Sequence, residues 1–237
     1  MLKIGIYCDT LASVTNVSDL YITVKLWRKG ELSMFFDSVF FIIFGYLLGS
    51  ILFGRISAVL FHHKDFMEKS PDKNPGTANA FLYGGFFCGI FTLLGDILKG
   101  FLPVYFYLNY VQEPYNYTLS LVLAAPVIGH IFPLFYKFKG GKGIAASFGC
   151  LLALIPHWQP LAIFALVFIF FSTILKISPN YYRTIWAYIV SLIIMFIIED
   201  SAFVVMGFAI IVTATMLKLR ASDEEKDKVK VSLLWMH

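Results

Sequence analysis

Seven apolar segments, separated by short polar connections, fill most of the sequence after residue 34. They lie at about 35–61, 80–108, 118–136, 144–156, 160–176, 184–198 and 202–218. A helix needs about 20 apolar residues to cross a bilayer, so 144–156 is short and is expected to begin inside the membrane boundary. Since 59% of the residues are hydrophobic and only 14% are charged, the sequence excludes a soluble domain. It predicts an all-α, polytopic integral membrane protein with about seven transmembrane helices.

The connections between these segments differ in charge, and the difference predicts an orientation. Connections 109–117, 157–159 and 199–201 carry acidic residues and no lysine or arginine. The basic residues of the alternate connections and of the C-terminal tail are Lys64, Lys69, Lys73, Lys137, Lys139, Lys142, Arg183, Arg220, Lys226, Lys228 and Lys230. Because basic loops remain in the cytoplasm, the basic set is expected on the cytoplasmic side of the membrane.

The two ends of the chain are more polar than its centre. Residues 1–33 contain no long apolar run and do not have the pattern of a secretory signal, so we interpret them as a polar N-terminal extension. Seven spans would place its basic residues outside the cell, and a biological start at Met34 would remove that conflict. The predicted organisation is therefore this extension, a membrane domain at 34–220 and a charged cytoplasmic tail at 221–237.

Other functional classes find little support in the sequence. Cys8, Cys88 and Cys150 show no CxxC spacing, so neither a metal site nor a disulfide framework is expected. We see no nucleic-acid motif and expect no cofactor. The oligomeric state stays open.

A basic glycine loop, Phe138-Lys-Gly-Gly-Lys-Gly143, is the strongest functional signal. Adjacent glycines allow backbone N–H groups to form a concave nest for an anion, and a helix is expected to start just after Gly143. Lys139 and Lys142 add two positive charges, so Gly140, Gly141 and Gly143 are candidate phosphate-binding residues. An ordinary flexible turn with lysines placed by membrane topology is the alternative. A nucleotide P-loop is disfavoured because Gly143 stands where that motif needs Ser or Thr.

The connection after the first apolar segment is a second candidate site. Asn74, Gly76, Thr77 and Asn79 could form a polar cradle for a polyol or a phosphate on the same side as Lys142. The alternative is purely structural, with Thr77 or Asn79 capping the helix that follows.

Several isolated polar residues have two interpretations each. Asp96 and Lys99 are three residues apart in an apolar segment, which favours an internal ion pair over direct contact with substrate. His130 could act as a base or a phosphate hydrogen-bond donor, or it could be a structural residue at a helix end. Arg183 could be a topological anchor or a further phosphate contact.

Taken together, these motifs resemble the bacterial membrane glycerol-3-phosphate acyltransferases that use acyl phosphate as donor. The resemblance covers about residues 35–220. Four motifs carry it: Gly45-Tyr-Leu-Leu-Gly-Ser-Ile51, Asn74-x-Gly76-x-x-Asn79, Asp96-x-x-Lys99-Gly-Phe-x-Pro103, and Gly129-His-x-x-Pro133 running into Phe138-Lys-Gly-Gly-Lys-Gly143. The last of these motifs is the most specific.

This resemblance implies a seven-helix enzyme of the bacterial cell (inner) membrane, with its motif loops facing the cytoplasm. It would move a fatty acyl group from acyl phosphate to the 1-hydroxyl of glycerol 3-phosphate. The products would be lysophosphatidate and phosphate, formed without a metal or an acyl-enzyme. It implies that Lys142 and the Gly140–Gly143 loop hold phosphate and that the Asn74–Asn79 loop helps to bind the acceptor. His130 would orient the loop or carry a proton.

The chain departs from the family pattern at several positions. Asp72 replaces a serine, Leu82 stands where members carry an arginine, and the expected histidine and asparagine are absent after the last span. These departures motivate a second hypothesis, a catalytically degenerate paralogue that binds a phosphorylated lipid or regulates a true acyltransferase. A transporter of a phosphorylated metabolite is a third, against which the sequence shows no pair of inverted halves.

Overall fold

The computed structural model describes residues 36–63, 66–70, 73–111, 114, 116–222 and 229–233. It divides into two compact units, residues 1–40 and residues 41–237. Of the first unit only residues 36–40 are described, and they are helical. The expected N-terminal extension and the proposed start at Met34 fall outside the described residues. Apart from residues 36–40, which begin the first apolar helix, the elements discussed below belong to the second unit.

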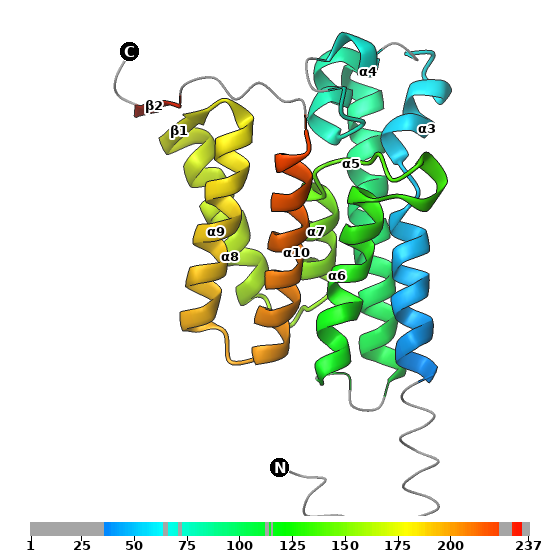
Figure 1. The fold of residues 1–237 in the computed structure, drawn as a ribbon, viewed down its shortest axis with the longest axis vertical. Helices are drawn as coiled ribbons and strands as arrows, with labels where there is room; N and C mark the ends of the chain where they lie inside the picture. Colours follow the sequence, from blue (N-terminus) through cyan, green and yellow to red (C-terminus); the bar gives the residue numbers. More distant parts are fainter. Residues whose placement is uncertain are drawn as a thin grey trace, which may run out of the picture. The chain divides into compact units, whose positions relative to one another are not determined.

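The second unit is mainly helical, as the apolar pattern predicted. Residues 41–49 are helical, and the elements that follow are α3 (Phe53–Leu60), α4 (Phe66–Lys69), α5 (Thr77–Tyr110), α6 (Tyr117–Ile131), the short 3₁₀ turn η1 (Leu134–Tyr136), α7 (Ile144–Leu152), α8 (Gln159–Ile169), the π-helical turn η2 (Phe170–Ile174), β1 (Leu175–Ser178), α9 (Asn180–Ile198), α10 (Ala202–Arg220) and β2 (Lys230–Leu233). Helix α10 lies between α6 and α9, α8 packs beside α9, and α5 packs along α7 (Figure 1).

Each of the seven predicted apolar segments contains helix, but they differ in length. Among the described residues, five helices are long and apolar enough to cross a membrane: Phe36–Leu60, Thr77–Tyr110, Tyr117–Tyr136, Asn180–Ile198 and Ala202–Arg220. Helix α7 has nine residues, which agrees with the short segment expected after the glycine loop. The fifth segment forms α8 and η2 and is also shorter than a full span.

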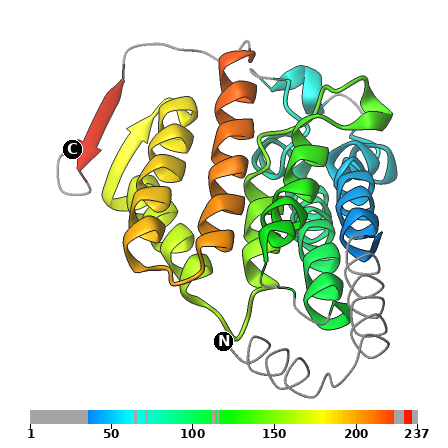
Figure 2. The ribbon, with the colours of Figure 1, turned by 60° about the horizontal axis from the view of Figure 1, so that its bottom comes forward.

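A small two-stranded sheet is the main departure from the predicted all-helical fold. Strand β1 begins at the end of the fifth apolar segment, and β2 lies within the expected charged tail. The two strands pair antiparallel (Figure 2). Ile177 lies opposite Val231, and Lys176 lies opposite Ser232. Both strands alternate apolar and polar residues. In β1 this alternation buries Ile177, whereas Val231 of β2 is exposed. That pattern is only four residues long in each strand, too short to be noticed beside the long apolar runs.

Very close packing between α5 and α7 fixes the site described below. A side chain at Gly100 of α5 would overlap the carbonyl oxygen of Ala146, and one at Gly149 of α7 would overlap that of Ile97. Small residues at such positions let membrane helices approach until their backbones touch. The start of α7 is therefore held firmly against the middle of α5.

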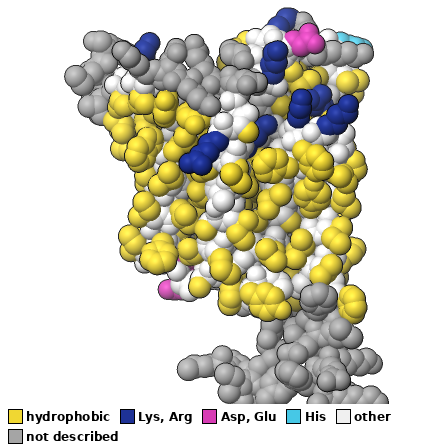
Figure 3. Space-filling model, viewed as in Figure 1, with side chains coloured by type: hydrophobic (Ala, Val, Ile, Leu, Met, Phe, Trp, Pro, Cys, Tyr) yellow, Lys and Arg dark blue, Asp and Glu magenta, His cyan; other side chains and the backbone are white. Residues whose placement is uncertain are grey.

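The charged residues divide between the two ends of the bundle. Figure 3 shows the lysine and arginine side chains gathered over the end that holds α3 and α4, above a broad apolar belt. The turn between α9 and α10, with Glu199 and Asp200, lies at the other end (Figure 1). This is the charge separation that the sequence predicted.

Candidate active site

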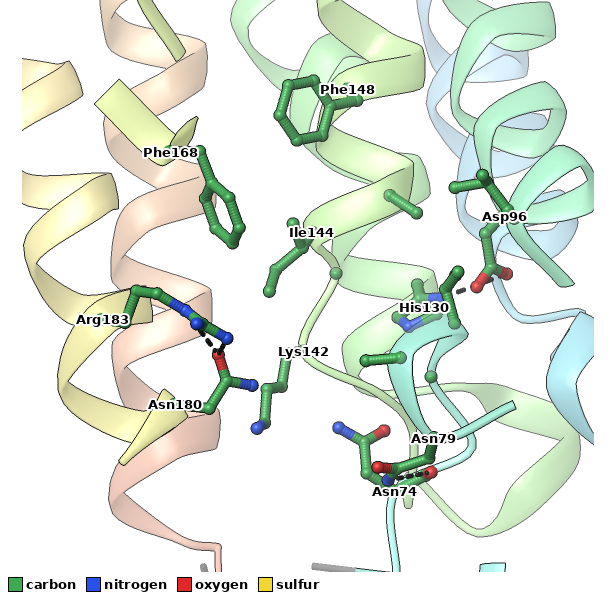
Figure 4. Close-up of a pocket in the computed structure, with 16 residues that line it drawn as sticks. Asn74, Asn79, Asp96, His130, Lys142, Ile144, Phe148, Phe168, Asn180 and Arg183 are labelled. Atoms are coloured by element: carbon green, nitrogen blue, oxygen red, sulfur yellow. Dashed lines mark hydrogen bonds and ion pairs between the residues drawn. The ribbon is translucent and has the colours of Figure 1, made fainter. Parts of the chain in front are cut away.

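A cavity of about 290 Å³ opens within the basic half of the bundle and collects most of the predicted functional residues. Its walls come from the loop before α5, the middle of α5, the end of α6, the start of α7, α8 and the start of α9 (Figure 4). The polar side chains that line it are Asn74, Thr77, Asn79, Asp96, His130, Lys142, Asn180 and Arg183. Residues separated by more than 100 positions in the sequence therefore meet at one site.

Three helix N-termini open onto this cavity. Helices α5, α7 and α9 begin after Gly76, Gly143 and Pro179, and none of these N-cap residues makes a side-chain capping hydrogen bond. The first residues of all three helices line the cavity. The first N–H groups of a helix have no partner inside the helix and carry the positive end of its dipole. Three such ends around one cavity make a binding site for an anion.

The glycine loop does not form the predicted nest at Gly140 and Gly141. The N–H of Gly140 donates to the carbonyl of Ile131 at 3.2 Å, and the N–H of Gly141 donates to the carbonyl of His130 at 3.1 Å. Both amides are therefore used to close the end of α6, and neither glycine lines the cavity. A side chain at either position would overlap His130. These glycines allow close approach to His130, and the expectation that their amides bind phosphate was wrong.

The two lysines of the loop lie in different environments. The side chain of Lys142 is only 8% exposed and lines the cavity, where it lies near Asn180 and Asn74 (Figure 4). Lys139 is exposed and is not part of the cavity wall. Gly143, with φ of 81°, turns the chain from Lys142 into α7. Of the two lysines predicted to bind phosphate, only Lys142 lines the cavity, together with Gly143.

Asp96, Lys99 and His130 form a buried cluster beside the cavity. The expected ion pair is present, with 2.8 Å between Lys99 Nζ and Asp96 Oδ1, and Lys99 also donates to the carbonyl of Ile51 at 2.6 Å. His130 Nδ1 lies 3.5 Å from Asp96 Oδ1, a contact that sequence reasoning missed. The imidazole therefore lies between Asp96 and Gly141; Figure 4 shows it beside Asp96. Asp96 and His130 line the cavity, whereas Lys99 lies outside the cavity wall and holds the Asp96 carboxylate through their ion pair.

The loop before α5 is closed by its own asparagines. Asn79 Nδ2 donates to the carbonyl of Asn74 at 2.9 Å, which shapes the loop around Gly76. The predicted capping of α5 by Thr77 or Asn79 was wrong, because the N-cap is Gly76, which has no side chain. Within the described part of the chain, the buried Thr77 hydroxyl has no hydrogen-bond partner. It lines the cavity and can bind a ligand there.

Arg183 is part of the cavity wall and not only a topological anchor. Its Nε and Nη2 donate to Asn180 Oδ1 at 3.1 Å and 2.6 Å, and this pair faces Lys142 across the cavity (Figure 4). Sequence reasoning missed Asn180, although its spacing of three residues from Arg183 at a helix start was a usable signal. It also missed the apolar wall formed by Leu93, Ile144, Phe148 and Phe168.

Fold and site together define a polytopic membrane protein with a cationic cavity, fit for a phosphorylated ligand, on the basic side of its helix bundle. The chain belongs to the glycerol-3-phosphate acyltransferase family, whose sequence profile matches residues 39–224. This confirms the resemblance seen in the sequence.

Individual relatives support the same assignment. A glycerol-3-phosphate acyltransferase of Endomicrobium trichonymphae is 41% identical over 134 residues, 56% of this chain and 66% of that protein. One from Actinobacillus pleuropneumoniae serotype 5b (strain L20) is 44% identical over 113 residues, 48% of this chain and 56% of that protein. The matched region thus spans less than two thirds of the length of these two relatives.

A solved structure resembles this fold over most of its length. It is the glycerol 3-phosphate form of PlsY (YgiH), an integral membrane glycerol 3-phosphate acyltransferase. The match has a TM-score of 0.66 and 28% sequence identity, and it covers 77% of this chain and 88% of PlsY. The lysophosphatidic acid form of PlsY matches with a TM-score of 0.63.

Proposed function

We propose that this protein transfers a fatty acyl group from acyl phosphate to the 1-hydroxyl of glycerol 3-phosphate, as a step of phospholipid biosynthesis. The bond between the acyl carbon and the phosphate oxygen breaks, an ester bond to the glycerol oxygen forms, and inorganic phosphate leaves. The hydroxyl proton is lost to phosphate or to solvent. Family membership and the two PlsY structures, one with glycerol 3-phosphate and one with lysophosphatidic acid, support this reaction.

The observation that carries the proposal is the convergence of Lys142, Arg183 and three helix N-termini on one cavity. Both substrates carry phosphate, and the departing phosphate gains negative charge in the transition state. Fixed positive groups lower the energy of that charge without having to reorganise. Holding both substrates in one cavity also removes the entropic cost of bringing them together.

The remaining residues fit roles in positioning. Asn74, Thr77 and Asn79 offer amide and hydroxyl groups for the acceptor polyol, and Leu93, Ile144, Phe148 and Phe168 offer an apolar wall for the acyl chain. His130 accepts the Gly141 N–H through its carbonyl and packs its ring on that glycine. In this role it is a positioning residue that fixes the loop carrying Lys142.

We also propose that the cavity faces the cytoplasm of a bacterial cell membrane. The cavity lies in the half of the bundle that carries the basic loops, and basic loops remain in the cytoplasm. Glycerol 3-phosphate, which is charged and water-soluble, would then reach the site without crossing the bilayer.

The proposed reaction can be tested directly with the full-length protein in detergent. Incubation with acyl phosphate and glycerol 3-phosphate should form lysophosphatidate and release one inorganic phosphate per turnover, measured by lipid chromatography and phosphate assay. Omission of either substrate should abolish product. If no lysophosphatidate forms while a known acyltransferase is active in parallel, the reaction is wrong and the degenerate paralogue becomes the better hypothesis.

Arg183 provides a sharper test of how the acceptor is bound. Leu82, at the position where the family resemblance places an arginine, is 75% exposed and is not part of the cavity wall. Arg183 is the cation that the described structure supplies beside Lys142. We expect Arg183→Ala to raise KM for glycerol 3-phosphate by roughly ten- to a hundredfold, since a charge-assisted hydrogen bond contributes roughly 1.5–3 kcal/mol.

The matched control for this variant is Arg220→Ala, because Arg220 is an exposed arginine at the end of α10 and lies outside the cavity. It should leave KM unchanged. The KM of Arg183→Lys should lie between those of wild type and Arg183→Ala, because a lysine keeps the positive charge but cannot make a bidentate hydrogen bond. An unchanged KM in Arg183→Ala would remove Arg183 from the acceptor site.

A further inference from the structure

Helix α3 has an unusual division between its two faces. Its buried face consists of small residues, Gly54, Ser57 and Ala58, and Ser57 Oγ lies 2.8 Å from Thr92 Oγ1 of α5. The outward residues are Ile56, Val59 and Leu60, which are 38%, 58% and 55% exposed. An outward face of this kind suits contact with hydrocarbon rather than water.

One charged residue, Arg55, lies on this apolar face. Arg55 and Val59 are four residues apart, as are Ile56 and Leu60, so the four side chains form a single strip along the helix. Arg55 lies about two turns before His62 and His63, the polar residues that follow α3. Helix α3 belongs to the end of the bundle where basic side chains gather (Figure 3). A lone cation near hydrocarbon is costly unless an anion compensates it.

A groove of about 640 Å³ lies beside Arg55, between α3, α4 and η1. Arg55, Ile56, Val59, Leu60, Met67 and Tyr136 line it, and no acidic side chain of the described residues does. It shares no lining residue with the proposed active site. The groove is therefore a separate feature that the acyl-transfer proposal does not use.

The guanidinium group of Arg55 is already held in place within this groove. Its carbon lies 5.2 Å from the centre of the Tyr136 ring, in a cation–π contact. Its Nε is shielded from solvent and has no hydrogen-bond partner within the described residues. A buried guanidinium N–H without an acceptor costs free energy, and a phosphate oxygen is the acceptor whose geometry suits it.

We propose that this groove binds one anionic phospholipid of the surrounding bilayer, with its phosphate on Arg55 and an acyl chain along Ile56, Val59 and Leu60. Basic pockets between membrane helices on the basic side of a protein favour acidic headgroups. Lys137, an exposed residue that follows Tyr136 in the sequence, adds a second positive charge to this end of the bundle. The apolar walls require a lipid rather than a free anion, since inorganic phosphate would leave them uncovered.

The test is native mass spectrometry of the full-length protein, released from micelles that contain phosphatidylglycerol or phosphatidylcholine. Wild-type protein should retain one phosphatidylglycerol in preference to phosphatidylcholine. Arg55→Gln should reduce that retention by about tenfold, the loss expected for a charge-assisted contact. The control Lys176→Gln removes an exposed lysine of β1, outside the groove, and should change nothing.

Thermal unfolding distinguishes a lost site from a misfolded variant. Phosphatidylglycerol should raise the unfolding midpoint of wild type but not of Arg55→Gln, while the two proteins should unfold at the same temperature in phosphatidylcholine alone. Equal retention of both lipids, or equal retention by wild type and Arg55→Gln, would overturn the proposal. Displacement of the lipid by millimolar inorganic phosphate would also overturn it, because the site would then be a free-anion site. None of these readouts depends on acyl transfer.

Discussion

Lys142→Ala should lower kcat/KM for acyl transfer by about a thousandfold, the scale seen when an electrostatic group is removed from a water-excluded site. Lys142 is 8% exposed and lies in the cavity next to the start of α7, where its charge adds to that of the helix N-terminus. An alanine leaves the departing phosphate without its nearest amine. The measurement is initial-rate kinetics of lysophosphatidate formation in detergent.

Lys139→Ala is the matched control, since Lys139 lies in the same loop, three residues earlier, and is exposed. It should keep kcat/KM within about twofold of wild type, because exposed charges act weakly through water. Lys142→Arg should recover part of the activity. Equal losses in Lys139→Ala and Lys142→Ala would mean that the whole loop acts as a diffuse basic patch, and the specific role of Lys142 would be wrong.

Asp96→Ala should destabilise the protein by about 3–5 kcal/mol, the loss expected when one partner of a buried ion pair is removed. Lys99 is 1% exposed and, among the described residues, would keep the Ile51 carbonyl and the Phe53 ring as partners but would lose its carboxylate. His130 would lose the carboxylate that lies 3.5 Å from its Nδ1, so the cavity would also lose a fixed wall. Chemical or thermal unfolding in detergent, followed by circular dichroism, measures the loss.

The double variant Asp96→Asn with Lys99→Met separates charge from shape. It removes both charges and keeps similar volumes, so it should recover most of the stability lost in Asp96→Ala. Glu68→Gln, an exposed acidic residue of α4, should unfold like wild type. If Asp96→Ala unfolds like wild type, the buried pair does not stabilise this fold.

The helical fold was predictable because hydropathy, averaged along each apolar segment, is high enough to indicate a helix in a membrane. Seven apolar segments appear as helix, and the short segment after Gly143 is indeed the short helix α7. The pairing of β1 with β2 was missed because the two strands are four residues each and about 50 positions apart. Short, non-local pairings leave no strong periodic signal in the sequence.

The candidate site was predictable in its residues but not in its geometry. Asn74, His130 and Lys142 were identified as candidates, and the structure brings all three to one cavity. The role of the Gly140 and Gly141 amides was wrong because it depends on which acceptors lie nearby, and the end of α6 provides them. The spacing between Asn180 and Arg183 indicated that the two side chains could pair, but their position at the cavity depends on where the tertiary fold places the α9 N-terminus.

The helix starts at Gly76, Gly143 and Pro179 come from distant parts of the chain and meet only when the bundle has assembled. Their attraction for an anion comes from the peptide backbone, which side-chain substitution does not remove. Substitution of a single lysine or arginine at the cavity therefore leaves the backbone share of the anion affinity in place. A variant of this chain that lacks one basic side chain at the cavity should therefore still attract an anion there.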